Sequence, residues 1–238
     1  AANYMWGTTG IGYNVKMAEK ILGADAKIDS WDIVFKPENL AKFRDCGIHM
    51  LDSADDILPA ALSYLGIDPN STKQADLEKA ADLIGKIRPN VRKFHSSEYL
   101  GALASGEICF VVGWSGDIMQ ARSRAAEARN GIEIGYTIPK EGAQMFFDNL
   151  AIPADAKNVA EAYELINYLY RPDVAAKNSD FLSYANGNLA SQKLIDQKIL
   201  NDRNIYPDEA MQKKLFVINA RDPAVRKYRE AAAAFHAR

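Results

Sequence analysis

The chain has 238 residues, 48% of them hydrophobic, and its 29 basic and 31 acidic residues give a formal net charge of −2 at pH 7. This composition can bury a core as one large domain or two small ones, and the evenly spread charge argues against binding to nucleic acid. The apolar runs are only a few residues long, so we expect no transmembrane helix, and the first residues do not have the order of a signal peptide.

The predicted elements alternate between strands and helices. In chain order they are a strand over 4–13, helices over 15–22 and from Pro37, a strand over 48–51, helices from 53–56, over 74–87 and over 99–104, a strand over 108–114, a helix over 117–129, strands over 132–139 and 145–152, and helices over 158–170 and 172–179. After a loop at 186–188 the remainder is expected to be helical, with helices starting at Pro207 and at Asp222. Asn14 is expected to cap the first of these helices and Gly23 to end it. Short strands alternating with helices predict an α/β fold.

Two corners of the chain pair an aromatic ring with an acid. One predicted strand ends in a glycine-flanked corner that carries Trp114 and Asp117, and a second short strand carries Phe146 and Asp148. A carboxylate meets a cation and an aromatic face covers hydrocarbon, with a cation–π contribution of roughly 0.5–2 kcal/mol, so the pattern suits an organic cation. Spacing alone leaves another interpretation open, in which both rings are ordinary core, Asp117 is a helix-start acid favoured by the helix dipole, and Asp148 caps a bulge.

A hydrolase is a second candidate from a different class. The corner Gly113–Asp117 is similar to the Gly-x-Ser-x-Gly turn of serine hydrolases, with the second glycine displaced by one position. Ser115 would then need a base from His49, His95 or His236. The acids at 117 and 148 could instead act as general acid and base.

Phosphate and metal ligands are less well supported by the sequence. Gly7, Gly10 and Gly12 do not have the spacing of a phosphate-binding loop, and we expect them to let a strand pass a tight place. The three histidines are scattered, and the sequence contains no pattern of paired histidines or cysteines that binds metal. No metal site is predicted.

The two cysteines, Cys46 and Cys109, leave two possibilities open. In a reducing compartment both would be buried thiols. In an oxidising compartment they could form one disulfide, because both flanks are predicted strand starts that could be neighbours in one sheet; closing a loop of that size is worth roughly 4 kcal/mol in the chain-entropy model.

Six segments carry a resemblance to a known family. They are Tyr4–Asn14, Trp31–Asn39, Tyr64–Gly66, Phe94–Ser97, Ile138–Gly142 and Tyr184–Asn188. Through them the chain, from residue 4 to about 220, resembles the periplasmic polyamine-binding proteins of bacterial ABC importers, with the putrescine and spermidine receptors as the nearest group. The resemblance implies a type II periplasmic binding protein-like fold, in which two α/β lobes joined by crossing strands close on the ligand, and it implies neither catalysis nor a cofactor.

The resemblance also implies a ligand site. Trp114 would cover the methylene chain of the polyamine and Asp117 would take one ammonium group. Phe146 would stack on the opposite side, while Asp148 together with Tyr184 would take the other end. Phe146 and Asp148, two residues apart on a strand, face the same side, which agrees with this reading.

Three further expectations rest on the same resemblance. An acid from the segment 52–56 would reach the ligand pocket. The resemblance favours Asp56, whereas a shift of one residue in the matching would select Asp55 instead. The nearby Ser53 favours putrescine over a longer polyamine. The family tends to join the positions of Cys46 and Cys109 as a disulfide, which favours the oxidised alternative.

The chain departs from the family pattern at its amino-terminal side, where an early part of the first lobe has no counterpart. Residues 1–8 and 140–185 are expected to be what remains of lobe 1 with the crossing strands, and residues 9–139 and 186–238 to form lobe 2. The expected partners are putrescine or spermidine and the membrane permease of the importer, the expected location is the periplasm, and the expected state is a monomer. A third possibility is a lobe fragment that folds and binds nothing.

Overall fold

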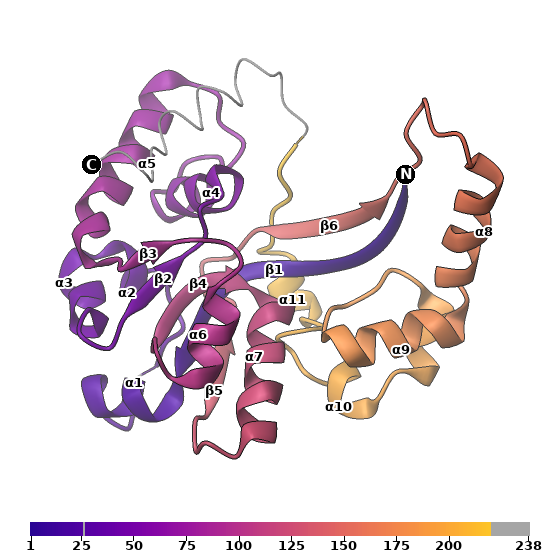
Figure 1. Ribbon diagram of the computed structural model, residues 1–238. Helices are drawn as coiled ribbons and strands as arrows, with labels where there is room; N and C mark the ends of the chain where they lie inside the picture. The colour runs from indigo at the N-terminus through magenta and orange to yellow at the C-terminus, as the bar shows by residue number, and fades with distance from the viewer. Residues whose placement is uncertain (26, 220–238) are drawn as a thin grey trace.

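The computed structural model describes residues 1–25 and 27–219, and Figure 1 shows how its elements are arranged. The strands are β1 (Ala2–Asn14), β2 (Ile48–Met50), β3 (Lys93–Phe94), β4 (Phe110–Trp114), β5 (Ile134–Thr137) and β6 (Met145–Leu150). The helices are α1 (Val15–Leu22), α2 (Asp32–Phe35), α3 (Pro37–Leu40), α4 (Ala54–Tyr64), α5 (Gln74–Ile87), α6 (Tyr99–Ser105), α7 (Ser115–Ala128), α8 (Val159–Leu169), α9 (Pro172–Leu182), α10 (Gln197–Leu200) and α11 (Glu209–Gln212), with 3₁₀ turns at Ala41–Phe43, Arg88–Asn90 and Leu189–Leu194.

One long strand, β1, organises the sheet. The strand order is β3-β2-β4-β1-β5, with β2 parallel to its neighbours β3 and β4 and β1 antiparallel to β4 and β5. The second half of β1 pairs with β4, while its first half, up to Thr8, pairs with β6 instead. β1 therefore changes partner between Thr8 and Thr9, and we call this point the fork. Mixed strands with helices between them confirm the predicted α/β fold.

The hydrophobic core lies around the main sheet. Helices α6 and α7 pack on β4, and α7 also packs on β1 and β5, while α2, α3, α4 and α5 form a second group, seen at the left of Figure 1. The largest fully buried side chains include Trp31, Tyr99, Phe43 and Phe110. Within the described residues, no helix combines the length and apolarity that crossing a membrane requires.

Local sequence signals near the amino-terminal end were accurate. The Asn14 side chain accepts a hydrogen bond from the backbone N–H of Met17 at 3.1 Å and caps α1, and Gly23, with φ of 97°, ends it.

Cys46 and Cys109 form a disulfide, with Cα atoms 5.5 Å apart, which confirms the pairing that the family resemblance implied. Cys46 lies just before β2, and Cys109 directly precedes β4. Since β2 and β4 are neighbours in the sheet, the two cysteines lie side by side.

The expectation that the remainder after the 186–188 loop is helical was only partly confirmed within the described residues, where a helix does begin next to Pro207. That segment contains a 3₁₀ turn and two helices of four residues each, α10 and α11. Asn188, Asp196 and Asp208 each accept hydrogen bonds from backbone N–H groups two or three residues ahead, and such local bonds compete with longer helices. The helix expected from Asp222 lies outside the described residues.

The three glycines of β1, Gly7, Gly10 and Gly12, do lie where neighbouring side chains leave no room for a Cβ atom. A Cβ atom added at Gly10 would lie 2.5 Å from the Tyr136 hydroxyl oxygen, and one at Gly7 would lie 2.7 Å from Cε1 of Tyr184. At Gly12 the added atom would meet the side chain of Ile118 at 2.8 Å. Bulky side chains from β5, from α7 and from the segment after α9 thus pack directly on the β1 backbone.

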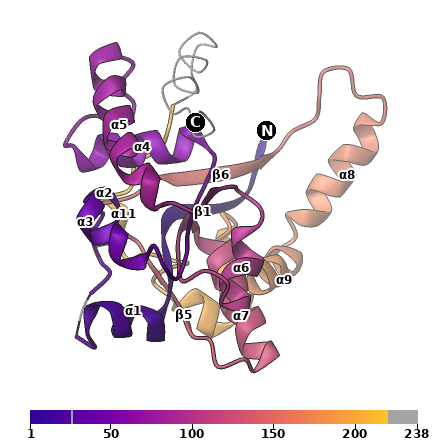
Figure 2. The same cartoon turned by 60° about the vertical axis from the view of Figure 1, so that its left-hand side comes forward.

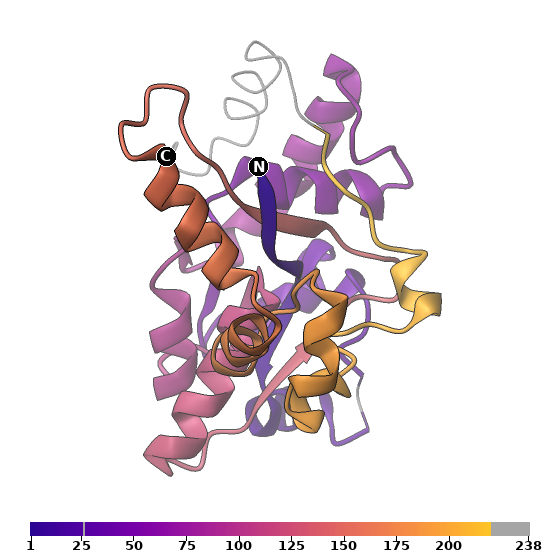
Figure 3. The same ribbon diagram turned by 90° about the vertical axis from the view of Figure 1, so that its right-hand side faces the viewer.

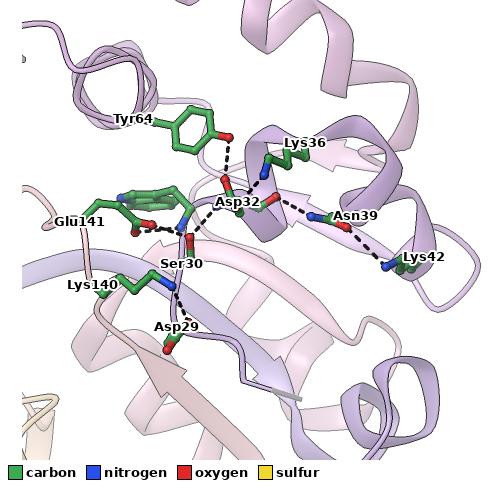
Figure 4. A network of polar contacts seen from close by, with 10 residues as sticks. Asp29, Ser30, Asp32, Lys36, Asn39, Lys42, Tyr64, Lys140 and Glu141 are labelled. Carbon is green, nitrogen blue, oxygen red and sulfur yellow. Dashed lines mark hydrogen bonds and ion pairs between the residues drawn. The ribbon is translucent and has the colours of Figure 1, made fainter. Parts of the chain in front are cut away.

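Three of the family-like segments, Trp31–Asn39, Tyr64–Gly66 and Ile138–Gly142, serve the fold through a polar network, which Figure 4 shows. The Trp31 indole donates to the carbonyl of Gly142 at 2.9 Å, and its backbone N–H donates to the Glu141 carboxylate at 3.1 Å. Asp32 accepts from Lys36 and from the Tyr64 hydroxyl, both at 2.7 Å. Partial burial, followed by the contact with Asp32, raises the pKa of Tyr64 to about 12, so this hydroxyl remains a donor. The network fastens the segment before α2 to the turn that follows β5.

Helix α8 stands apart from the rest of the molecule in Figures 1, 2 and 3. It packs against α9, and none of its residues is buried although its sequence is largely apolar. Tyr163 and Leu165 are each 59% exposed, and Phe181 of α9 is 82% exposed. We call this apolar surface of α8 and α9 the α8 face.

Candidate functional site

The two aromatic–acid corners meet at the fork of β1. Trp114, at the end of β4, lies opposite Thr9, and Phe146 of β6 lies opposite Gly7. The two rings are therefore anchored opposite positions 7 and 9 of one strand, although 32 residues separate Trp114 from Phe146 along the chain. The pleated backbone of β1 sets the distance between them.

Asp117 lies in the first turn of α7, and two tyrosine hydroxyls hydrogen-bond to its carboxylate. The Tyr99 hydroxyl donates to its Oδ2 atom at 2.8 Å, and the Tyr184 hydroxyl donates to its Oδ1 atom at 3.0 Å. Burial is the main cause that raises the pKa of both tyrosines above the usual value, so both remain protonated donors. An acid in the first turn is also favoured by the helix dipole.

Tyr184 reaches this position through a short strand-like contact. The backbone N–H of Trp6 donates to the carbonyl of Ala185 at 2.8 Å, which places residue 184 beside β1. The family resemblance led us to expect Tyr184 together with Asp148. In the structure its hydroxyl bonds to Asp117 instead.

The aromatic side chains form a continuous bent surface. The Trp114 and Phe146 rings have centroids 6.3 Å apart and planes at 67°, and Phe146 and Tyr184 have centroids 6.1 Å apart and planes at 70°. A methylene chain held between two ring faces needs roughly parallel planes about 7–8 Å apart, because each carbon–carbon contact is about 3.5–4.0 Å. Trp114 and Phe146 meet edge to face in this structure, and the stacking of Phe146 on the side of a ligand opposite Trp114 stays a prediction.

Asp56 is the acid of its segment that contacts the corner. It lies in the first turn of α4, is 6% exposed, and accepts at Oδ1 from the Thr9 hydroxyl at 2.6 Å and from the Trp114 indole N–H at 3.2 Å. Ser53 also hydrogen-bonds to it. Burial raises the pKa of Asp56, against the effect of these donors. This carboxyl group fixes the indole ring of Trp114.

Asp148 lies on β6 and is solvent-exposed. Partial desolvation, and then the negative charge of Asp117, raise its pKa above the usual value. A cation bound between Asp117 and Asp148 would reduce the repulsion between their carboxylates. The fork therefore combines apolar rings with acids that lack a cationic partner among the described ion pairs.

The hydrolase interpretation does not fit the position of Ser115. Its side chain is 2% exposed, and its Oγ atom accepts the backbone N–H of Thr8 at 3.2 Å. His49 is buried on β2, and the backbone N–H groups of residues 97 and 98 both donate to Nδ1 of His95. His236 lies outside the described residues. A buried serine that holds the backbone together is a structural group. It is not an exposed nucleophile.

A metal centre has no support in the described part of the chain. Within residues 1–25 and 27–219, no group of three or more His, Cys, Asp or Glu side chains is placed to hold a metal ion.

Two residues of the site were missed from the sequence. The ring of Tyr99 is fully buried, and its hydroxyl reaches Asp117. Thr9 lies in the glycine-rich part of β1, and its hydroxyl holds Asp56. Neither has a periodic signal, because each acts through one polar atom on a side chain that is otherwise packed.

Residues 2–205 match the family described as bacterial extracellular solute-binding protein. The chain belongs to that family. Among curated relatives, the chain is 49% identical over 233 residues to the putrescine-binding periplasmic protein PotF of Escherichia coli (strain K12), covering 98% of the chain and 63% of the relative. It is 50% identical over 216 residues to the putrescine-binding periplasmic protein SpuD of Pseudomonas aeruginosa (strain UCBPP-PA14), covering 91% of the chain and 59% of the relative.

Solved structures support the same fold. A structure from Listeria monocytogenes has a TM-score of 0.83 at 30% identity and covers 98% of this chain and 67% of that one. The spermidine/putrescine ABC transporter substrate-binding protein PotD of Streptococcus pneumoniae has a TM-score of 0.75 at 28% identity, covering 97% of this chain and 66% of that one. The chain thus spans about three fifths of the length of the curated relatives and about two thirds of these structures.

Proposed function

We propose that this chain forms the larger part of a polyamine receptor of an ABC importer and binds putrescine or spermidine without catalysis. The observation that supports this most is the fork, where Asp117, Asp148 and buried Asp56 surround the bent aromatic surface of Trp114 and Phe146. Carboxylates stabilise ammonium groups and ring faces cover methylene carbons, so the site suits a chain with cationic ends. The relatives PotF and SpuD are themselves putrescine-binding proteins.

In this proposal the two ends of the ligand have different acids. Asp117, already oriented by two hydroxyl donors, takes one ammonium group, and exposed Asp148 takes the other. Trp114 covers the methylene chain from one side, and Phe146 joins it at an angle. Ser53, uncharged and next to Asp56, favours the shorter putrescine, because it adds no further acid for a third amine.

The division into lobes is part of the same proposal. Residues 1–8 and 140–185 would belong to lobe 1, and residues 9–139 and 186–238 to lobe 2. The change of partner along β1 at Thr8 and Thr9 supports this boundary. The exposed α8 face supports it as well, because it is an apolar surface on the lobe 1 side that a longer receptor would cover.

Location and partners follow from the relatives and remain part of the proposal. PotF and SpuD are periplasmic binding proteins, and the streptococcal PotD is the substrate-binding protein of an ABC transporter. We therefore place the whole receptor in the periplasm, as a monomer that docks on the membrane permease and does not bind nucleic acid.

Titration calorimetry tests the binding proposal. Putrescine and spermidine should bind, whereas the uncharged 1,4-butanediol should not. Asp148→Asn and Trp114→Ala should each weaken diamine binding by about tenfold or more, since loss of 1.4 kcal/mol is a factor of ten. Asp82→Asn, the same chemical change at an exposed position of α5, serves as the matched control.

The outcomes separate the remaining alternatives. If Asp148→Asn and Trp114→Ala bind diamines like the unchanged chain, the site is wrong. Turnover of an ester or glycoside that Ser115→Ala abolishes would favour the hydrolase. No binding by this chain, with binding gained when the unmatched segment of PotF is fused to it, would identify it as a non-binding lobe fragment.

A further inference from the structure

We propose that Tyr99 is a positioning residue for polyamine binding, because its hydroxyl fixes the Asp117 carboxylate to the backbone of the aromatic corner. This inference rests on the proposed function and goes further, since it assigns the orientation of the ligand-binding acid to a residue that the ligand cannot reach. Tyr99 is 0% exposed. It acts through Asp117 and not by contact with the ligand.

The direction of the Tyr99 hydroxyl is determined by its two partners. The backbone N–H of Trp114 donates to the Tyr99 oxygen at 3.2 Å, so this oxygen is an acceptor there. Its own proton is then free for the Asp117 Oδ2 atom, 2.8 Å away. Since burial keeps the pKa of Tyr99 far above neutral pH, the proton remains on the oxygen. The chain of bonds runs from Trp114 N–H through Tyr99 to Asp117.

The ring of Tyr99 is itself held without freedom to move. Its centroid lies 6.5 Å from that of Trp114, with the planes at 64°, and it packs on the backbone of Gly113, where an added Cβ would lie 2.9 Å from Cε2 of the ring. A rigid donor of this kind fixes its acceptor more strictly than a surface side chain or water would.

Two donors on different oxygens leave little rotational freedom to Asp117. Tyr99 occupies one lone pair of Oδ2 and Tyr184 one lone pair of Oδ1. A carboxylate offers about four acceptor positions, so the others remain available to an ammonium group. The ligand therefore meets a carboxylate whose plane is already set.

This arrangement makes Tyr99 a determinant of ligand length. Asp117 and Asp148 would hold the two ends of a diamine, so the distance between them selects the number of methylene groups. If Tyr99 no longer holds Asp117, that carboxylate can rotate and accept a longer or shorter diamine. A purely structural role would weaken all diamines equally and leave their ratio unchanged.

The test is calorimetry of Tyr99→Phe with putrescine and with 1,5-diaminopentane. We expect putrescine affinity to fall about tenfold and the preference for putrescine over the longer diamine to fall severalfold. In an Asp117→Asn background, Tyr99→Phe should have little further effect, since it acts through that acid. Tyr136→Phe is the matched control, because Tyr136 is also buried, and its hydroxyl is hydrogen-bonded to Thr8 and not to Asp117.

A second measurement needs no ligand. The urea midpoints of Tyr99→Phe, Asp117→Asn and the double variant should be non-additive, as expected for two groups that share one bond. Additive midpoints would overturn the positioning role, as would an unchanged diamine ratio in Tyr99→Phe. If Tyr99→Phe does not fold, Asp117→Asn alone decides, since putrescine affinity equal to that of Asp82→Asn would overturn the role. If the unchanged chain binds no diamine, the proposed function fails. The urea midpoints of the single and double variants still test whether Tyr99 and Asp117 are coupled.

Discussion

Gly116→Ala is the substitution for which the structure gives the clearest quantitative expectation. Gly116 is the second residue of α7. An added Cβ would lie 2.3 Å from both Cδ2 and Cε2 of Tyr184 and 2.5 Å from Cζ, against about 3.5–4.0 Å for an ordinary carbon contact. The Tyr184 ring cannot simply shift away, because it also packs on the backbone of Gly7, where an added Cβ would lie 2.7 Å from its Cε1 atom.

Three effects decide the magnitude. Alanine is favoured over glycine in a helix by about 1 kcal/mol. Overpacking costs about 1–3 kcal/mol, and loss of the Tyr184 hydrogen bond to the Asp117 carboxylate costs about 1.5–3 kcal/mol. The net expectation is a loss of about 1.5–5 kcal/mol in the free energy of unfolding, with putrescine affinity lowered about tenfold or more.

Urea unfolding and calorimetry measure both quantities. Gly85→Ala is the matched control, because nothing lies within 4 Å of the added Cβ in α5, and it should raise stability by about 0.5–1 kcal/mol. A Gly116→Ala variant that is as stable as Gly85→Ala and keeps its putrescine affinity would refute this account of the site.

Three further outcomes are expected. Replacing Cys46 and Cys109 by Ala should lower the free energy of unfolding by about 4 kcal/mol, because the disulfide spans 63 residues, and urea unfolding with and without reductant would measure this. Putrescine binding should release protons and weaken as the pH falls, because the raised pKa of Asp148 lets it take up a proton at higher pH than an ordinary aspartate. Calorimetry in two buffers of different ionisation enthalpy checks this, and Asp148→Asn should reduce the release, with Asp56, whose pKa burial also raises, still present. Leu165→Gln should change stability by less than about 0.5 kcal/mol since it is 59% exposed, whereas Leu103→Ala at a fully buried position should cost about 2–5 kcal/mol; equal effects in urea unfolding would contradict the exposed α8 face.

Features set by neighbouring residues were predictable from the sequence. Asn14 and Gly23 bound α1 as expected, because a cap depends only on the few residues around it. The corner at Trp114 was also recognisable, since glycine, ring and acid follow one another directly. The family resemblance supplied what local patterns cannot, such as the pairing of Cys46 with Cys109.

The partners of individual polar atoms were not predictable. Tyr184 bonds to Asp117 across 67 residues, and its choice of acid depends on how the segment around Ala185 pairs with β1. Tyr99 shows the same difficulty, since hydrophobic periodicity places a ring in the core but does not say where its hydroxyl points. Such contacts are decided by tertiary packing, which one sequence read alone does not contain.

The fork in β1 has a consequence for protein engineering. The side chains that face the proposed ligand project from strand ends and first helical turns, whereas the fully buried side chains Phe110, Ile11 and Leu103 lie further along the same elements or beneath them. Asp148 is solvent-exposed on β6 and can be exchanged without opening a cavity, whereas Phe146 is half-buried against Trp114 and Tyr184. Under the proposed function, a library at position 148 alone would therefore vary the charge offered to an organic cation and leave the packed rings in place.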